Sequence, residues 1–141
     1  MKTLPRLALI TASSLLLGAV PMATTAPFTM NFFGFTSSAT SADGTWSANG
    51  GISEVGGFTM SWTLSGGQLA HLDATLVGKQ GSITFAGALR YVATSPTDSE
   101  LTGLIRLTGG TGLYAGIRGN GKAALAISAG SLTGAISGQT N

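Results

Sequence analysis

The chain has 141 residues, of which only 9% are charged, and it contains no cysteine, which excludes disulfide bridges and a lipid anchor on cysteine. Its formal net charge of +2 at pH 7 comes from Lys2 and Arg6, because the remaining basic and acidic residues balance. The remaining five cations are scattered and do not form the basic cluster that phosphate binding needs, so we expect no nucleic-acid partner.

The first residues have the three parts of a secretory signal. Lys2 and Arg6 form a basic start, residues 7–20 an apolar run, and residues 21–26 a small, helix-breaking end. The apolar run is shorter than the roughly 20 residues that span a bilayer. We therefore predict a signal-peptide helix within residues 1–26 and a secreted or periplasmic protein with no membrane association after cleavage. The alternative is a retained membrane anchor.

The boundary of the mature chain is placed after Ala26, with Ala23 and Ala19 as alternatives. Residues 27–141 are then of the size of one domain. Their composition, rich in Gly, Ser and Thr and poor in charge, is typical of a β protein with many tight turns.

Apolar and polar residues alternate along the chain with the period of a strand. The clearest case is 57–65, where Phe58, Met60, Trp62 and Leu64 alternate with Ser and Thr. Glycine-rich or polar turns separate such segments. The pattern predicts eight strands and no helix in the mature chain, at residues 28–36, 44–49, 57–65, 70–78, 82–93, 101–108, 122–128 and 131–138. Gly87 is expected to mark a bend or bulge.

Eight antiparallel strands with short connections remove their exposed edges most simply by closing on themselves. We therefore predict an all-β fold, an eight-stranded antiparallel up-and-down barrel. An open sandwich is the alternative. Phe33 and Phe35 face away from Phe28, Met30 and Phe32, so both faces of this first strand are expected to be covered, the outer one by a subunit contact in a homo-oligomer.

Residues 109–121 form a glycine-dense connection between two predicted strands. Glycine reaches positive φ without steric cost, so this segment can turn tightly. Leu113, Tyr114 and Ile117 are too apolar for a solvated loop, and we expect them to fold back and plug one end of the core. The glycines at 110–115 fit a dinucleotide-binding pattern, but the helix and the acidic residue that this pattern requires do not follow. Ala123 likewise replaces the Ser/Thr of a phosphate-binding loop.

The same connection carries a resemblance to known proteins. Residues 109–114, Gly-Gly-Thr-Gly-Leu-Tyr, followed by Arg118-Gly119, resemble the corresponding segment of the allene oxide cyclase and dirigent families, with Ile117 in place of a small residue. More loosely, most of the mature chain is similar to small exported bacterial barrels of this type, through the motifs at 51–53, 57–59, 81–85 and 132–134. The resemblance implies an eight-stranded barrel and, for an enzyme, a cofactor-free cyclase or isomerase that positions an apolar substrate.

Strand parity predicts what the barrel encloses. If Trp62 points inward, the interior is apolar, and Tyr91 is its one ionisable group. An eight-stranded barrel is just wide enough to be filled by side chains or to hold one small ligand. Both a packed core and an apolar pocket open at one end are therefore compatible with the sequence, the pocket having Tyr91 and Trp62 as polar handles. The candidate ligand-binding residues are Met60, Trp62, Phe85, Tyr91, Tyr114 and Arg118, the last at the barrel mouth.

Other residue types offer little chemistry. His71 is the one histidine, so a metal site is not expected, and Asp73 beside it completes no triad without a nucleophile. No serine stands in a nucleophile elbow. Asp98 and Glu100 are interpreted as solvated loop residues rather than a carboxylate pair. We assign no catalytic residue, no metal and no cofactor.

Three functions follow as hypotheses. The first is an exported barrel of unassigned activity that binds a small apolar molecule in its interior. The second is a cyclase or isomerase that steers ring closure by positioning its substrate. The third is an extracellular structural protein that oligomerises through Phe33 and Phe35.

Overall fold

The computed structural model describes residues 25–141. The predicted signal-peptide helix therefore lies outside the described residues. Within residues 25–141, no helix has the length and apolar character needed to cross a membrane.

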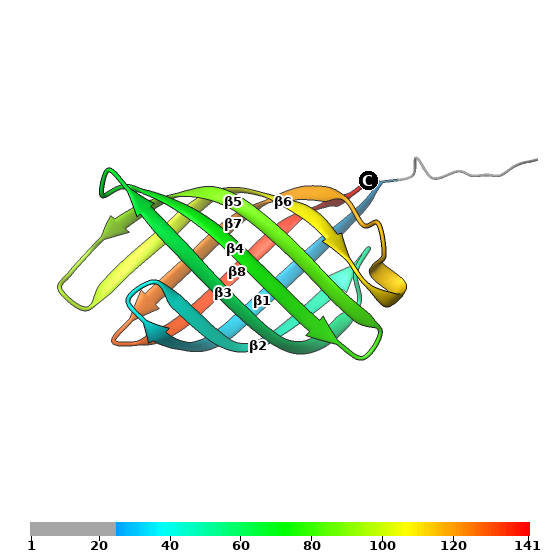
Figure 1. Ribbon diagram of the computed structural model, residues 1–141, viewed down its shortest axis with the longest axis horizontal. Helices are drawn as coiled ribbons and strands as arrows, with labels where there is room; N and C mark the ends of the chain where they lie inside the picture. The colour runs from blue at the N-terminus through cyan, green and yellow to red at the C-terminus, as the bar shows by residue number, and fades with distance from the viewer. Residues whose placement is uncertain (1–24) are drawn as a thin grey trace, which may run out of the picture.

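The described chain forms a closed barrel of eight antiparallel strands in sequential order (Figure 1). Each strand pairs with the next, and β1 pairs with β8 to close the sheet. The predicted up-and-down barrel is thereby confirmed, and the open sandwich is not observed. The strands are β1 Ala26–Ser38, β2 Ser41–Gly50, β3 Glu54–Ser65, β4 Leu69–Gly78, β5 Gly81–Ala93, β6 Asp98–Gly110, β7 Gly119–Ser128 and β8 Ser131–Thr140.

Up-and-down topology gives the barrel two distinct ends. One end carries the turns that follow β1, β3, β5 and β7, and we call it the Tyr91 end, after the tyrosine near the end of β5. The other carries the turns after β2, β4 and β6 and the C-terminus, and we call it the Tyr114 end (Figure 1).

The strands extend further than the sequence pattern predicted. Residues 37–43 were expected to be a polar connection, but only Ala39 and Thr40 separate β1 from β2. The expected loop at 94–99 likewise loses Asp98 and Ser99 to β6. The reason is that the outer face of the barrel is in water, so polar side chains such as Asp43 continue a strand at no cost.

The predicted alternation places apolar side chains inside. These side chains form one continuous cluster with buried residues of the remaining strands, β1, β2, β4, β7 and β8. As expected, the cluster includes Phe58, Met60, Trp62, Ile83, Phe85, Leu89, Leu101, Ile105 and Leu107. The ring of Phe32 packs edge-on against Phe58 and Phe85, with centroids 5.3 and 6.2 Å away. Burial of these large side chains is the main stabilising term of the fold.

The barrel wall contains two bulges, and neither is at Gly87. One lies on β1, where Ser37 is the extra residue between Thr36 and Ser38. The other lies on β6, where Thr108 is the extra residue opposite Thr84 and Phe85 of β5. Gly87 pairs regularly with Ile105. The prediction for Gly87 was wrong because this glycine allows the β6 backbone to lie close to β5. A Cβ there would overlap the carbonyl oxygen of Leu104.

The glycine-dense connection folds as predicted in part. It contains a single 3₁₀ turn, η3 Gly112–Tyr114, and Tyr114 is buried in the end of the core, with Ile117 packed against it. Leu113, expected in the plug, is 69% exposed. Three consecutive residues of a 3₁₀ turn point in different directions, so burial of Tyr114 leaves its neighbour facing the solvent.

Gly34 and Gly44 face each other inside the barrel on β1 and β2. A Cβ on Gly34 would overlap the carbonyl oxygen of Asp43, which is backbone and cannot rotate away. We predict that Gly34→Ala lowers the free energy of unfolding by about 1–3 kcal/mol through overpacking. Urea denaturation followed by tryptophan fluorescence measures this. The control Thr29→Ala, on the outer face of the same strand, is expected to stay within about 0.5 kcal/mol of wild type. An unchanged midpoint for Gly34→Ala would contradict the packing argument.

Candidate functional site

A hollow of about 300 Å³ lies at the Tyr91 end of the barrel. Its walls come from the ends of β1, β5 and β7, the start of β6 and the turns between them. Backbone hydrogen bonds hold these turns together, among them Ala129 N–H to the carbonyl oxygen of Thr97, at 3.1 Å. The lining residues are Thr36, Ser38, Ala39, Tyr91, Ala93, Ser95, Pro96, Thr97, Asp98, Ser99, Ile127 and Gly130.

Tyr91 connects this hollow to the core. Its side chain is half-buried, lines the hollow and packs against the buried apolar cluster, as does Ile127. The backbone N–H of Tyr91 donates to the carbonyl oxygen of Gln68, at 2.7 Å, which ties β5 to the β3–β4 turn. The aromatic ring is therefore placed between the buried interior and the end of the barrel.

Trp62 carries a buried donor at the same end. Its backbone N–H donates to the carbonyl oxygen of Thr40 in the β1–β2 turn, at 2.9 Å. Its indole is buried, and the indole Nε1–H has no hydrogen-bond partner among the described residues. Leaving a buried donor unpaired costs on the order of 1–3 kcal/mol. The other tryptophan, Trp46, is equally buried but donates to the carbonyl oxygen of Val77, at 3.2 Å.

The six predicted ligand-binding residues do not meet in one place. Trp62 and Tyr91 lie toward the Tyr91 end, and Tyr114 and Arg118 belong to the opposite end. Met60 and Phe85 are buried in the wall between the ends. Arg118 is exposed, and its guanidinium donates to the carbonyl oxygen of Ile117, at 2.8 Å.

The Tyr114 end contains a buried carboxylate that the sequence reasoning missed. Glu54, at the start of β3, is 8% exposed. Its Oε2 accepts a hydrogen bond from the backbone N–H of Gln80, at 3.1 Å, and its Oε1 accepts from Gln80 Nε2, at 2.6 Å, and from Tyr114 Oη, at 3.1 Å. A Cβ on Gly78 would overlap this carboxylate, so a larger residue there would displace the Glu54 side chain from its hydrogen bonds.

The prediction that Tyr91 is the one ionisable group inside the barrel was therefore wrong. Tyr91 is half-buried, whereas Glu54 and Tyr114 are buried. The inward position of Glu54 could have been predicted, because the strand parity that turns Phe58 and Met60 inward also turns Glu54 inward. The prediction considered only the apolar residues of this strand.

Hydrogen bonding sets the charge state of this cluster. The backbone N–H of Gln80 is the largest cause that holds the pKa of Glu54 below its ordinary value, against the opposing effect of burial, and the side chains of Gln80 and Tyr114 act in the same direction. Burial first, and then Glu54, raise the pKa of Tyr114 to about 12. Glu54 is thus a carboxylate with its donors in place, and it joins β3, the β4–β5 turn and η3 rather than acting as a free acid or base.

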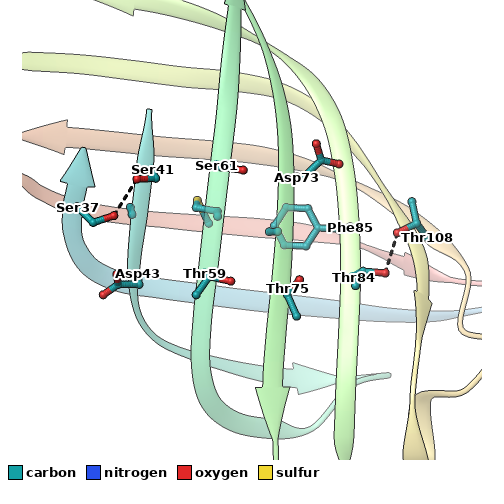
Figure 2. Close-up of a pocket in the computed structure, with 13 residues that line it drawn as sticks. Ser37, Ser41, Asp43, Thr59, Ser61, Asp73, Thr75, Thr84, Phe85 and Thr108 are labelled. Carbon is teal, nitrogen blue, oxygen red and sulfur yellow. Dashed lines mark hydrogen bonds between the residues drawn. The ribbon is translucent and has the colours of Figure 1, made fainter. Parts of the chain in front are cut away.

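A second hollow, of about 440 Å³, runs across the outer surface of β2 to β5. Figure 2 shows hydroxyl and carboxylate side chains along it, among them Asp43, Thr59, Asp73 and Thr75. We call it the outer groove. Nothing in the sequence points to it directly, because it depends on the register between strands.

The remaining candidate residues lie on β4 and β6. His71 is exposed on β4. Within residues 25–141, no group of three or more His, Cys, Asp or Glu residues could hold a metal ion. Asp98 and Glu100 lie on β6 rather than on a loop. Hydrogen bonds from Ser128 and Ser95 lower the pKa of Asp98, and the hydroxyl of Thr97 donates to its Oδ1, at 3.3 Å, so this side chain is a hydrogen-bonded carboxylate.

Scans of the chain against protein-family models, curated proteins and solved structures found no match. The resemblance to the allene oxide cyclase and dirigent families therefore stays a prediction. The function has to be inferred from the residues of this chain.

The Glu54–Tyr114 pair predicts how stability depends on pH. Unfolded Glu54 binds a proton near its ordinary pKa of 4.5, whereas the folded chain keeps the carboxylate, so its contribution is lost as pH falls below that value. Unfolded Tyr114 ionises near pH 10 and folded Tyr114 near 12, so stability is also lost as pH rises through this interval. Urea denaturation at a series of pH values measures both losses.

Substitutions separate the two arms of this profile. Glu54→Gln is expected to reduce the loss of stability at low pH, and Asp98 accounts for part of the loss that remains. Tyr114→Phe is expected to reduce the loss of stability at high pH. Tyr91→Phe serves as the control, because it leaves the Glu54–Tyr114 hydrogen bond in place. An alkaline loss of unchanged size in Tyr114→Phe would rule out this assignment.

Proposed function

We propose that this protein is an exported barrel that binds a small, largely apolar molecule at the Tyr91 end. The molecule carries one hydrogen-bond acceptor, which pairs with the indole N–H of Trp62. The observation that carries the proposal is the buried Nε1–H of Trp62, which has no partner among residues 25–141. An acceptor on a ligand would recover the free energy that this unpaired donor costs.

The hollow at the Tyr91 end supports entry from that side. Tyr91 lines the hollow and packs against the buried cluster to which Trp62 belongs. A ligand that enters there would pass Tyr91 and displace side chains of the apolar cluster to reach the indole of Trp62. Because the surrounding cluster is apolar, the body of the ligand is apolar as well.

The chemistry of the hollow favours binding over turnover. Its ionisable lining residues are Tyr91 and Asp98. Asp98 is an ionised carboxylate satisfied by neighbouring hydroxyl groups, so it does not serve as a proton donor. General acid–base catalysis needs a group poised to exchange a proton at the working pH. We therefore rank a cyclase or isomerase activity second to binding.

The barrel type is part of the proposal. The eight-stranded up-and-down closure and the glycine-dense β6–β7 connection are both features that the allene oxide cyclase and dirigent families share with this chain in our interpretation. In a barrel of this type, a small apolar ligand would be held by shape and a few polar contacts. Export follows in the proposal from the basic, apolar and small-residue parts of residues 1–26.

The test uses the indole N–H signal of Trp62 in ¹H–¹⁵N spectra. In the Trp46→Phe variant, the remaining indole signal belongs to Trp62. We predict that a cyclic ketone such as menthone shifts this signal, because its carbonyl accepts the hydrogen bond, whereas the matched hydrocarbon p-menthane does not produce the same downfield shift. Trp62→Phe is expected to weaken ketone binding about 2- to 10-fold, the effect of one neutral hydrogen bond.

The structure offers a matched comparison for this substitution. Trp46 is as buried as Trp62, but its N–H is already paired with Val77. Ketone affinity is therefore expected to be similar in wild type and Trp46→Phe. If a panel of apolar ketones leaves the Trp62 signal unmoved at millimolar concentration, the barrel is a packed core and the proposal fails.

A further inference from the structure

The outer groove lies between the two bulges of the barrel. Ser37, the extra residue of the β1 bulge, stands at one side, and Thr108, the extra residue of the β6 bulge, at the other. Bulges bend a sheet and redirect side chains, and they are common beside binding sites. Here they border a hollow that crosses four strands on the outer face.

Strand register brings polar side chains side by side in this groove. One row runs Asp43, Thr59, Thr75 and Thr84 across β2 to β5, and the next row runs Ser41, Ser61 and Asp73. Neighbours in such a row have Cβ atoms about 5 Å apart. The result is a surface of hydroxyl groups with two carboxylates and no cation among its lining residues.

The middle of the groove has free hydrogen-bonding capacity. Among the residues that line it, side-chain hydrogen bonds join Ser37 to Ser41, at 2.8 Å, and Thr84 to Thr108, at 2.8 Å, both at its borders (Figure 2). Asp43, Thr59 and Asp73 stand between these pairs and point to the solvent. They are therefore available to a ligand.

An aromatic edge flanks the groove on β1. Phe35 is the cross-strand neighbour of Asp43, and Phe33 lies two residues before Phe35 on the same strand. The two rings are 60% and 52% exposed and pack edge-on, with centroids 5.5 Å apart. Phe33 also lines a further outer hollow of about 480 Å³, together with Asn31, Thr45, Ser47 and Val55. Phe33 thus lines one hollow, and Phe35 is the cross-strand neighbour of a residue that lines the other.

We propose that this face binds an uncharged polysaccharide chain. A sugar ring has an apolar C–H face, which suits an exposed aromatic ring, and a rim of hydroxyl groups, which suits carboxylate and hydroxyl partners. The two carboxylates and the missing cation disfavour acidic polymers. The two hollows fit successive sugars of a chain better than a single small molecule.

A second copy of the chain is the competing occupant of the Phe33 and Phe35 surface. An apolar contact between copies would also cover the cross-strand neighbour Asp43 and remove its carboxylate from water. Burial of an unpaired carboxylate is strongly unfavourable. A polysaccharide supplies hydroxyl donors to the same group, and this difference favours the polysaccharide.

The experiment is a depletion assay of the full mature chain on insoluble, uncharged polysaccharides: cellulose, chitin and a β-1,3-glucan. We expect retention on at least one of them. Phe35→Ala and Asp73→Asn are each expected to weaken that retention about tenfold, the effect of losing a ring contact or a charge-assisted hydrogen bond. Leu104→Ala is the matched control, because Leu104 is 67% exposed on β6 and does not line the groove.

Three outcomes would overturn the inference. They are no retention on any uncharged polymer, retention on acidic polymers such as alginate alone, and equal weakening by Leu104→Ala. Light scattering after size exclusion adds a fourth: a wild-type dimer that Phe35→Ala converts to a monomer would assign this surface to self-association. Thermal unfolding of each variant shows that it is folded. The ketone experiment at Trp62 is independent of these results, because Trp62 lies inside the barrel.

Discussion

The pairing of β1 with β8 is the contact on which the rest of the barrel depends. It gives the first and last strands hydrogen-bonding partners on both sides, so that no strand is an edge. Closure also gives every strand one face toward a shared interior and one toward water. The apolar inner face then supplies most of the stability, and the outer face is free to carry polar side chains.

This division explains where chemistry can reside in so small a fold. Inside, a polar group needs a hydrogen-bond partner, and Glu54 and Trp62 meet this requirement differently. Glu54 has three donors and fixes the Tyr114 end. The indole N–H of Trp62 has no partner among residues 25–141, which makes the other end a candidate binding site. Outside, water satisfies unpaired groups, so a row such as that of Asp43 and Thr59 costs nothing and remains available to a partner.

Much of the fold could be predicted from the sequence, because alternation is a local property. The parity of Phe58, Met60 and Trp62 is visible in nine residues, and the eight strands follow from similar segments. Long-range register is not local. The outer groove needs Asp43, Thr59 and Thr75 to be neighbours, and the two bulges shift the register at its borders, between β1 and β2 and between β5 and β6. The end assignment of Tyr91 and Tyr114 likewise depends on how the chain winds.

The same closure has a kinetic consequence. Every pair of neighbouring strands except one is a hairpin or short connection along the chain, and these form quickly from local encounters. The exception joins residues as far apart as Ala26 and Thr140, a separation of 114 residues. Such a nonlocal ladder carries a large loop-closure entropy, so we expect completion of the barrel to be the slow event of folding. In a chain that is still being synthesised, the hairpins can form, but one edge of β1 has no partner until β8 arrives.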